Sequence, residues 1–175
     1  MSHGLKSVLR RGENPLRLGV ISDTHGHVEL TRPAVRMLES LEVDAVLHCG
    51  DIGSMAVVEL FAQWPTHFVF GNCDDRTTIF AAEIEKAGQR CYGLFGELEF
   101  DGVNVALLHS HDRMRFREAI DSGRYGLVCY GHTHVAAIDR RGETVVLNPG
   151  AIYRASPHSI AVVDLPAVEA TIIEL

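Results

Sequence analysis

Short apolar runs alternate with segments of helical periodicity in the first half of the chain. Residues 16–22 (LRLGVIS) form an apolar run that ends in polar residues, and the apolar positions of residues 31–41 then recur at helical spacing. The same order occurs twice more. We therefore expect strands at residues 16–22, 45–49 and 66–70, and helices at residues 31–41, 55–63 and 77–86. Three successive strand–helix units indicate parallel strands with right-handed crossovers.

After Gln89 the pattern changes to short strands joined by tight turns. Asp101-Gly102 and Arg141-Gly142 are expected to be the turns of two hairpins. The expected elements are strands at 97–100, 103–108, 127–130, 135–140, 143–147, 159–164 and 170–174, with one helix at 113–122. An α/β first half followed by mainly antiparallel strands predicts two mixed sheets that pack together, with helices outside.

The length of the chain favours one domain that spans residues 1–175. Its 175 residues, 46% of them hydrophobic, can bury one core but are few for several domains. Residues 1–15 contain basic residues and no apolar run of signal-peptide length, so we expect a flexible N-terminal tail. The sequence also contains no uncharged stretch that could cross a bilayer, which argues against a membrane protein.

Charge and cysteine content restrict the classes of partner and the compartment. A net charge of −7 disfavours an extended nucleic-acid-binding face, which usually carries a basic stripe. A small phosphorylated substrate stays compatible with this charge, because bound divalent cations would make a local site positive. The four cysteines form no CxxC pair, so a reduced cytoplasmic protein is the simpler interpretation.

The first of five polar clusters, SDTHGH, follows the first expected strand. Asp23 and His25 are two residues apart, so both side chains can point the same way from an extended strand end and bind one ion. The structural alternative is that Asp23 or Thr24 caps the following helix.

The next two clusters follow the second and third expected strands. Asp51 comes after Gly50, which permits a close approach, and its two oxygens could each hold a different cation. Asn72 can offer a neutral carbonyl oxygen as a ligand. The alternatives are a helix cap for Asp51 and a turn residue for Asn72. Asp74 and Asp75 fit a cap or turn better than ligands, although Asp74 could orient a ligand.

Histidines supply the last two clusters. His109 ends an apolar run and could be either a ligand or a buried structural histidine. His132 and His134 flank Thr133 directly after the run LVCY, a spacing that presents two imidazoles to a common site. All five clusters follow strands, and ligands of open α/β sheets collect at the carboxyl ends of strands.

The ordered motifs DxH, GD, GN, an isolated histidine after a strand, and GHTH resemble those of the calcineurin-like metallophosphoesterase superfamily. SDTHG, GNCD and NPG together resemble its small prokaryotic phosphodiesterase branch. The resemblance runs from about Leu16 to Ile152 and implies a four-layer α/β/β/α sandwich. It also implies one cation held by Asp23, His25, Asp51 and His134, and a second held by Asp51, Asn72, His109 and His132.

The activity implied by this resemblance is hydrolysis of a phosphate ester, most directly of a phosphodiester. Two divalent ions about 3.5 to 4 Å apart lower the pKa of a bridging water, and this water or hydroxide attacks phosphorus without a covalent enzyme intermediate. Asp51, Asn72 and His109 are the expected catalytic residues. Mixed nitrogen and oxygen ligands favour Mn, Fe, Ni or Zn over Ca or Mg, and Mn²⁺ is the preferred assignment.

Some positions depart from the family pattern or stay open. Cys73 stands where many members have a histidine that protonates the leaving group, and a thiol is a poorer proton donor near neutral pH. Because cysteine is usual in the branch that the chain resembles, we interpret it as a marker of subfamily. His111 and Arg113 could contact the phosphate or the leaving group, or could simply begin a helix with surface charges. Asn148 in NPGA is expected to form a structural turn.

Two other functions are compatible with the same motifs. The superfamily includes a retromer subunit that acts as a protein scaffold, but that role would tolerate loss of the metal histidines, and none is missing here. A phosphomonoesterase or nucleotidase could use the same metals. The expected hairpins could also pair between two chains in a homo-oligomer.

Overall fold

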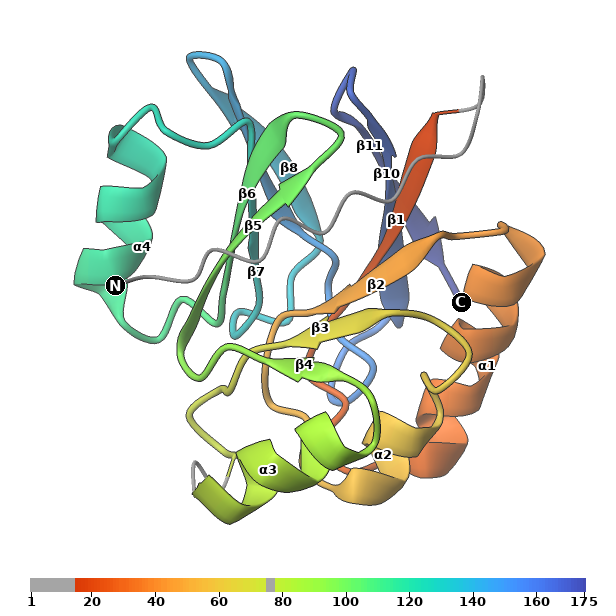
Figure 1. Ribbon diagram of the computed structural model, residues 1–175. Helices are drawn as coiled ribbons and strands as arrows, with labels where there is room; N and C mark the ends of the chain where they lie inside the picture. The colour runs from red at the N-terminus through yellow and green to blue at the C-terminus, as the bar shows by residue number, and fades with distance from the viewer. Residues whose placement is uncertain (1–14, 75–77) are drawn as a thin grey trace.

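The computed structural model of the chain describes residues 15–74 and 78–175. The expected N-terminal tail, apart from Pro15, lies outside these residues, as do Asp75 and the expected helix start at Thr77. Within them, two β-sheets lie face to face between helices on either side (Figure 1).

The first sheet has six strands in the order β11-β10-β1-β2-β3-β4. Its strands are β1 (Leu16–Ile21), β2 (Ala45–His48), β3 (Thr66–Phe68), β4 (Arg90–Cys91), β10 (Ser159–Leu165) and β11 (Glu169–Glu174). Strands β1 to β4 run parallel, as the successive strand–helix units predict. Strands β10 and β11 add an antiparallel edge.

The second sheet has five strands in the order β5-β6-β7-β9-β8. They are β5 (Phe95–Phe100), β6 (Val103–Leu108), β7 (Leu127–Tyr130), β8 (Ala137–Arg141) and β9 (Thr144–Asn148). Helices α1 (Val28–Ser40), α2 (Met55–Glu59) and α3 (Thr78–Lys86) cover the first sheet, and α4 (Arg113–Asp121) covers the second (Figure 1).

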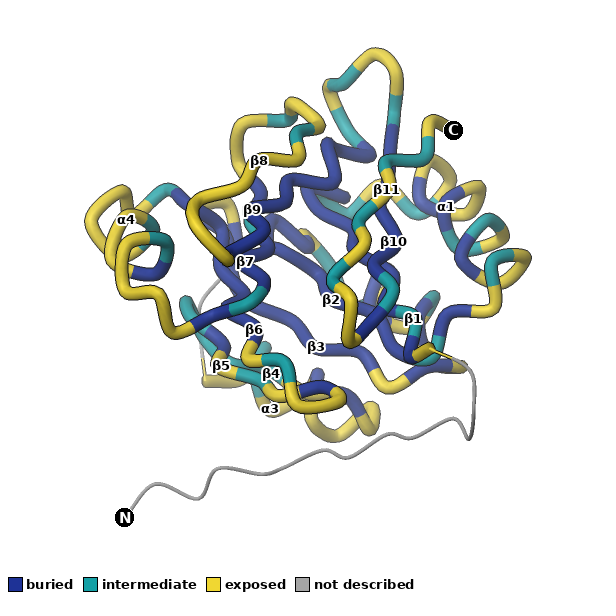
Figure 2. Tube along the Cα trace, turned by 90° about the horizontal axis from the view of Figure 1, so that it is seen from above, coloured by how far each residue is buried: buried dark blue, intermediate teal, exposed yellow. Residues whose placement is uncertain are grey.

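The alternation of side chains along the strands produces the layers. In β1, Leu16, Leu18 and Val20 face the core between the two sheets, whereas Ile21 packs towards the helices. A third cluster joins the second sheet to α4 through residues such as Ala119. The buried residues therefore lie mainly in the sheets, and the exposed ones on the outer turns and hairpin tips (Figure 2). This is the four-layer α/β/β/α sandwich that the family resemblance implies.

Element boundaries differ from the expectation at a few points. Strand β4 is not predicted, α1 begins earlier than residue 31, and α2 ends before residue 63. The second hairpin turns at Gly142-Glu143, one residue later than predicted, because Arg141 already pairs with Thr144. Gly142 then occupies the first turn position with φ +60°, a backbone region that favours glycine. The Asp101-Gly102 turn is confirmed, with positive φ at both residues.

In the described part of the chain, every helix is too short or too polar to cross a bilayer. The four cysteines, Cys49, Cys73, Cys91 and Cys129, are free thiols in this structure.

Candidate metal centre

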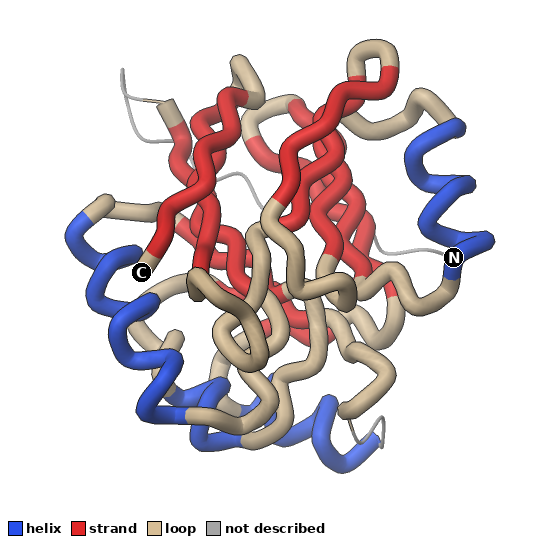
Figure 3. The backbone as a smooth tube through the Cα atoms, turned by 180° about the vertical axis from the view of Figure 1, so that it is seen from behind, coloured by secondary structure: helices blue, strands red, loops and turns tan. Residues whose placement is uncertain are grey.

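Loops gather at one end of the two sheets (Figure 3), and the five polar clusters lie in the loops after β1, β2, β3, β6 and β7. The loops after β1 and β2 are joined by backbone hydrogen bonds. The Asp23 N–H donates to Gly50 O at 3.0 Å, and the His25 N–H donates to Asp51 O at 2.8 Å. The parallel strands of each sheet thus bring their carboxyl ends, and the polar residues after them, to a common place.

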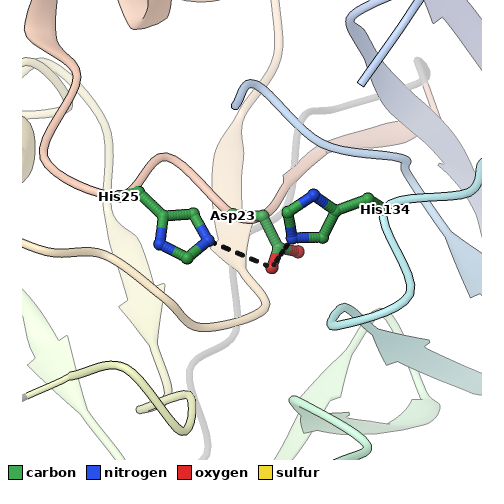
Figure 4. Close-up of side chains that lie close together, drawn as sticks. All are labelled: Asp23, His25 and His134. Atoms are coloured by element: carbon green, nitrogen blue, oxygen red, sulfur yellow. Dashed lines mark ion pairs between the residues drawn. The ribbon is translucent and has the colours of Figure 1, made fainter. Parts of the chain in front are cut away.

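The Asp23 carboxylate lies between imidazole rings of two different loops (Figure 4). Its Oδ1 atom is 3.0 Å from His134 Nε2, and 3.8 Å from the Nε2 atoms of both His25 and His109. Asp51 Oδ2 is 3.4 Å from His25 Nε2 and 3.2 Å from His109 Nε2. The structure therefore brings five of the seven predicted ligands into direct proximity.

These side chains fit a cation better than they fit one another. Asp23 Oδ1, His25 Nε2 and His109 Nε2 are buried atoms without a hydrogen-bond partner. A buried polar atom that lacks a partner costs about 1 to 3 kcal/mol, and three such atoms rarely converge without a ligand. The potential ligand atoms of Asp23, His25 and His134 lie within 4.8 Å of one another, as do those of Asp23, Asp51 and His109. These carboxylate and imidazole atoms are close enough together to hold a metal ion.

Backbone carbonyls set the orientation of two histidines. His109 Nδ1 is 2.7 Å from Cys49 O, and His134 Nδ1 is 3.3 Å from Arg154 O. Because a carbonyl only accepts, each Nδ1–H donates, and each Nε2 keeps its lone pair towards the carboxylates. Such hydrogen bonds commonly fix the tautomer of a metal-binding histidine.

The electrostatics of the centre favour a bound cation. Burial disfavours the ionised form of Asp51, but interactions with His109 and the Cys73 N–H outweigh it, so the Asp51 pKa lies below its ordinary value. For His109, burial is likewise outweighed, here by Asp51 and Asp23, so its pKa is raised. The carboxylates thus stabilise positive charge at His109, and a metal ion would compete with the proton there.

One oxygen of Asp51 faces both groups of potential ligands. Oδ1 accepts a hydrogen bond from the Cys73 N–H at 2.9 Å, which turns Oδ2 towards His25 and His109. Asp74 supports this arrangement, because its carboxylate accepts hydrogen bonds from the N–H groups of Gly53 and Gly71. It thereby joins the loop after β2 to the loop after β3. Of the roles considered for Asp74, orientation of a ligand loop fits this geometry.

Glycines around the centre are required by close packing. A Cβ atom at Gly71 would lie 1.9 Å from Asp51 Oδ1, and one at Gly131 would lie 2.0 Å from Ser22 Oγ. At Gly50 a Cβ atom would lie 2.7 Å from His109 Nδ1, which agrees with the close approach predicted there.

Five of the seven predicted ligands have a left-handed backbone, which is unfavourable for residues other than glycine. The φ values are 55° for Asp23, 46° for His25, 53° for Asp51, 84° for His132 and 59° for His134. Such positions cost on the order of 1–3 kcal/mol each and cluster at functional sites.

Helix capping, the alternative role considered for Asp23, Thr24 and Asp51, is not observed. The N-cap of α1 is His27, and that of α2 is Ser54. Asp23, Thr24 and Asp51 therefore lie before the caps rather than at them.

The remaining predicted residues lie around this group. The His132 N–H donates to Asp23 Oδ2 at 3.2 Å, and the His132 ring is 5.2 Å from that of His109. The His111 ring is 5.7 Å from the His109 ring. Asn72 is exposed, and its side-chain amide is 3.2 Å from Cys73 Sγ.

Three further residues are placed by the structure. Cys73 Sγ lies within 4.8 Å of the potential ligand atoms of His25 and Asp51. Arg113 is the exposed first residue of α4. Asn148 is buried and forms a structural turn as predicted, because its Oδ1 accepts from the Gly150 N–H and its Nδ2 donates to Thr133 Oγ1.

Sequence reasoning missed a buried pair beneath the centre, Thr24 and His48. Thr24 Oγ1 is 3.0 Å from His48 Nε2 and donates to Ile52 O at 3.0 Å. Since His48 Nδ1 accepts from the Gly50 N–H at 3.3 Å, Nε2 carries the proton and donates to Thr24. Burial lowers the pKa of His48 to about 3, so the ring is neutral at pH 7. A histidine inside the apolar run AVLHC was the available signal.

Comparison with known proteins agrees with this geometry. The model of the calcineurin-like phosphoesterase superfamily domain matches residues 16–167. A phosphodiesterase of Methanocaldococcus jannaschii is 29% identical over 138 residues, which cover 77% of this chain and 83% of that protein. "Probable metallophosphoesterase YsnB" of Bacillus subtilis is 30% identical over 133 residues, covering 76% and 73%.

A solved archaeal phosphodiesterase has a TM-score of 0.83 with this chain at 28% sequence identity, and the match covers 91% of this chain and all of that one. The order of motifs, the four layers and these matches lead to one conclusion: the chain belongs to the calcineurin-like phosphoesterase superfamily.

Proposed function

We propose that the chain is a phosphodiesterase with two divalent cations, which when bound lower the pKa of a water for direct attack on phosphorus and neutralise the phosphoryl oxygens. The observation that carries the proposal is the convergence of three buried atoms without partners, Asp23 Oδ1, His25 Nε2 and His109 Nε2. The substrate would be a small phosphorylated molecule. The relatives named as phosphodiesterases support the choice of a diester.

The candidate ligands divide between two positions that share Asp51. One cation would be held by Asp23, His25, Asp51 and His134, and the other by Asp51, Asn72, His109 and His132. Asp51 Oδ2 supports its shared role, because it faces both His25 and His109, and the close grouping of Asp23, His25 and His134 supports the first position. The mixture of imidazole and oxygen ligands favours Mn, Fe, Ni or Zn, and we propose Mn²⁺.

The residues at the rim would act on the substrate. His111 lies beside the His109 ring, where it could donate a hydrogen bond to a phosphoryl oxygen. Arg113 follows His111 by two residues, at the start of α4, and would add positive charge to this segment. Burial and the charge of Asp51 raise the pKa of the Cys73 thiol, so Cys73 is a weak acid for the leaving group. Esters whose leaving group has a low pKa are therefore the expected substrates.

The test is hydrolysis of bis(p-nitrophenyl) phosphate by protein supplied with Mn²⁺. Asp51→Asn removes the shared carboxylate, and His109→Ala removes a buried imidazole; both variants should lose nearly all activity. Asp139→Asn, on the exposed strand β8, is the matched control and should retain it. Retained activity in both site variants would refute the proposal.

Two measurements separate this proposal from the other functions. A phosphomonoesterase would hydrolyse p-nitrophenyl phosphate faster than the diester. A scaffold would purify without transition metal and would stay inactive after addition of Mn²⁺. The presence of every aspartate and histidine of the motif set argues against the scaffold.

A further inference from the structure

Three side chains that the proposed reaction does not use form a stack beside the candidate metal centre. The rings of His27 and Tyr153 are 4.0 Å apart between centroids, with an interplanar angle of 21°. The Arg154 guanidinium lies over the Tyr153 ring, 5.1 Å from its centroid. We call these three residues the aromatic platform.

The platform is connected to the candidate ligands at several points. The Tyr153 ring is 5.4 Å from the His25 ring, and the Tyr153 N–H donates to Asp23 O at 3.0 Å. The carbonyl of Arg154 accepts the hydrogen bond that orients His134. The platform therefore forms one wall of the group made by Asp23, His25 and His134.

The platform is available to a ligand. His27 and Arg154 are exposed, and Tyr153 is half-buried. His27 is the N-cap residue of α1, but its side chain makes no capping hydrogen bond, so helix capping does not explain the ring. Arg154 has φ +53°, an unfavourable conformation that holds its carbonyl towards His134 while its guanidinium extends over Tyr153.

The chemistry of this wall suits a planar ring. Aromatic side chains bind nucleobases and other flat rings by stacking, and a guanidinium adds a cation–π contribution. A phosphodiester carries two ester substituents on phosphorus, so a substrate held by the metal centre has two groups that can contact the surrounding side chains.

We propose that the aromatic platform of His27, Tyr153 and Arg154 binds the planar ring of a substituent on the substrate phosphorus. This inference rests on the proposed phosphodiesterase function and specifies its substrate class: phosphodiesters in which an ester substituent carries a planar ring, such as a nucleoside or a phenyl group. In this arrangement the exposed His27 ring meets the ligand, Tyr153 stacks against His27, and the Arg154 guanidinium lies over Tyr153.

The test compares two small phosphonates that cannot be hydrolysed as esters. Binding of phenylphosphonate and methylphosphonate to the Mn²⁺-loaded protein is measured by calorimetry. The unmodified protein should bind phenylphosphonate on the order of tenfold more tightly. His27→Leu should reduce this preference by about fivefold, because leucine fills space without a planar ring. His27→Phe should retain it.

A second variant keeps the backbone contact and removes the charge. Arg154→Gln leaves the carbonyl that accepts from His134 and should also reduce the preference for phenylphosphonate. Equal affinity of the unmodified protein for the two phosphonates, or the same preference in the His27→Leu and His27→Phe variants, would overturn the platform even if diesters are hydrolysed. Failure to hydrolyse any diester would refute the proposed function, whereas the phosphonate ratio would still decide the platform.

Discussion

Replacement of Thr24 by valine tests whether the buried Thr24–His48 pair supports the candidate metal centre. Valine has nearly the shape of threonine, so Thr24→Val removes one hydroxyl with little change in packing. The His48 Nε2–H then loses its acceptor, while Ile52 O keeps the hydrogen bond from the Gly26 N–H at 2.8 Å.

The expected cost follows from one orphaned donor. Both side chains are fully buried, so water cannot replace the lost partner. An unsatisfied buried donor costs about 1 to 3 kcal/mol, and we expect the free energy of unfolding to fall by that amount. Because Thr24 lies between Asp23 and His25, the affinity for Mn²⁺ should fall as well, by about tenfold, which is typical when a group that orients ligands is lost.

Urea unfolding followed by circular dichroism measures the first effect, and a calorimetric Mn²⁺ titration measures the second. Thr144→Val is the matched control: Thr144 is buried and donates to Tyr125 O at 2.7 Å, but in strand β9. It should lower stability without weakening Mn²⁺ binding. If Thr24→Val leaves both quantities unchanged, or affects Mn²⁺ binding no more than Thr144→Val does, the reasoning is wrong.

Three further predictions concern other parts of the fold. Gly71→Ala would place a Cβ atom 1.9 Å from Asp51 Oδ1, so Asp51 must move and the calorimetric affinity for Mn²⁺ should fall at least about tenfold; an unchanged affinity would contradict the packing argument. Burial lowers the pKa of His67 from 6.5 to about 4, so its contribution to stability is complete above pH 6.5 and is lost as the pH falls to 4, by about 1.4 kcal/mol per pH unit. The free energy of unfolding of His67→Gln, measured with urea, should therefore depend less steeply on pH in this interval than that of the unmodified protein. Equal dependence on pH in the two proteins would contradict a lowered pKa of His67. Burial and a hydrogen bond to Glu97 raise the pKa of Tyr125 from 10 to about 12, so its stabilising contribution is present below pH 10 and is lost between pH 10 and 12. Between pH 9 and pH 11, the melting temperature should fall less for Tyr125→Phe than for the unmodified protein. Equal falls in melting temperature would show that the pKa of Tyr125 is not raised in the folded state.

Strands and helices with a regular spacing of hydrophobic residues could be predicted from the sequence, because the side chains of each buried face recur at that spacing. Strand β1 places Leu16, Leu18 and Val20 in the core between the two sheets and Ile21 in the core beneath the helices, and the Asp-Gly turn identifies the β5–β6 hairpin. Strand β4 was missed because its two residues are too few to show a period.

The same distinction applies to the candidate site. Asp23, His25 and Asp51 follow strands directly, so their convergence could be predicted from strand order alone. The contact between His27 and Tyr153 could not, because the two residues lie far apart in the chain and only the folded layers bring them together. The contact between His48 and Thr24 could not be predicted for the same reason.

The left-handed backbone at the predicted ligands has a consequence for how this protein could evolve. Each of these positions is one where glycine or asparagine would relieve strain of about 1 to 3 kcal/mol. A descendant that no longer needed the metals could gain thermodynamic stability by substituting these ligand residues. The additional free energy of unfolding would then compensate for destabilising substitutions elsewhere on the surface. In the proposed metalloenzyme, loss of the ligands would then be thermodynamically downhill, so the site is held at a cost in conformational stability that bound cations would offset.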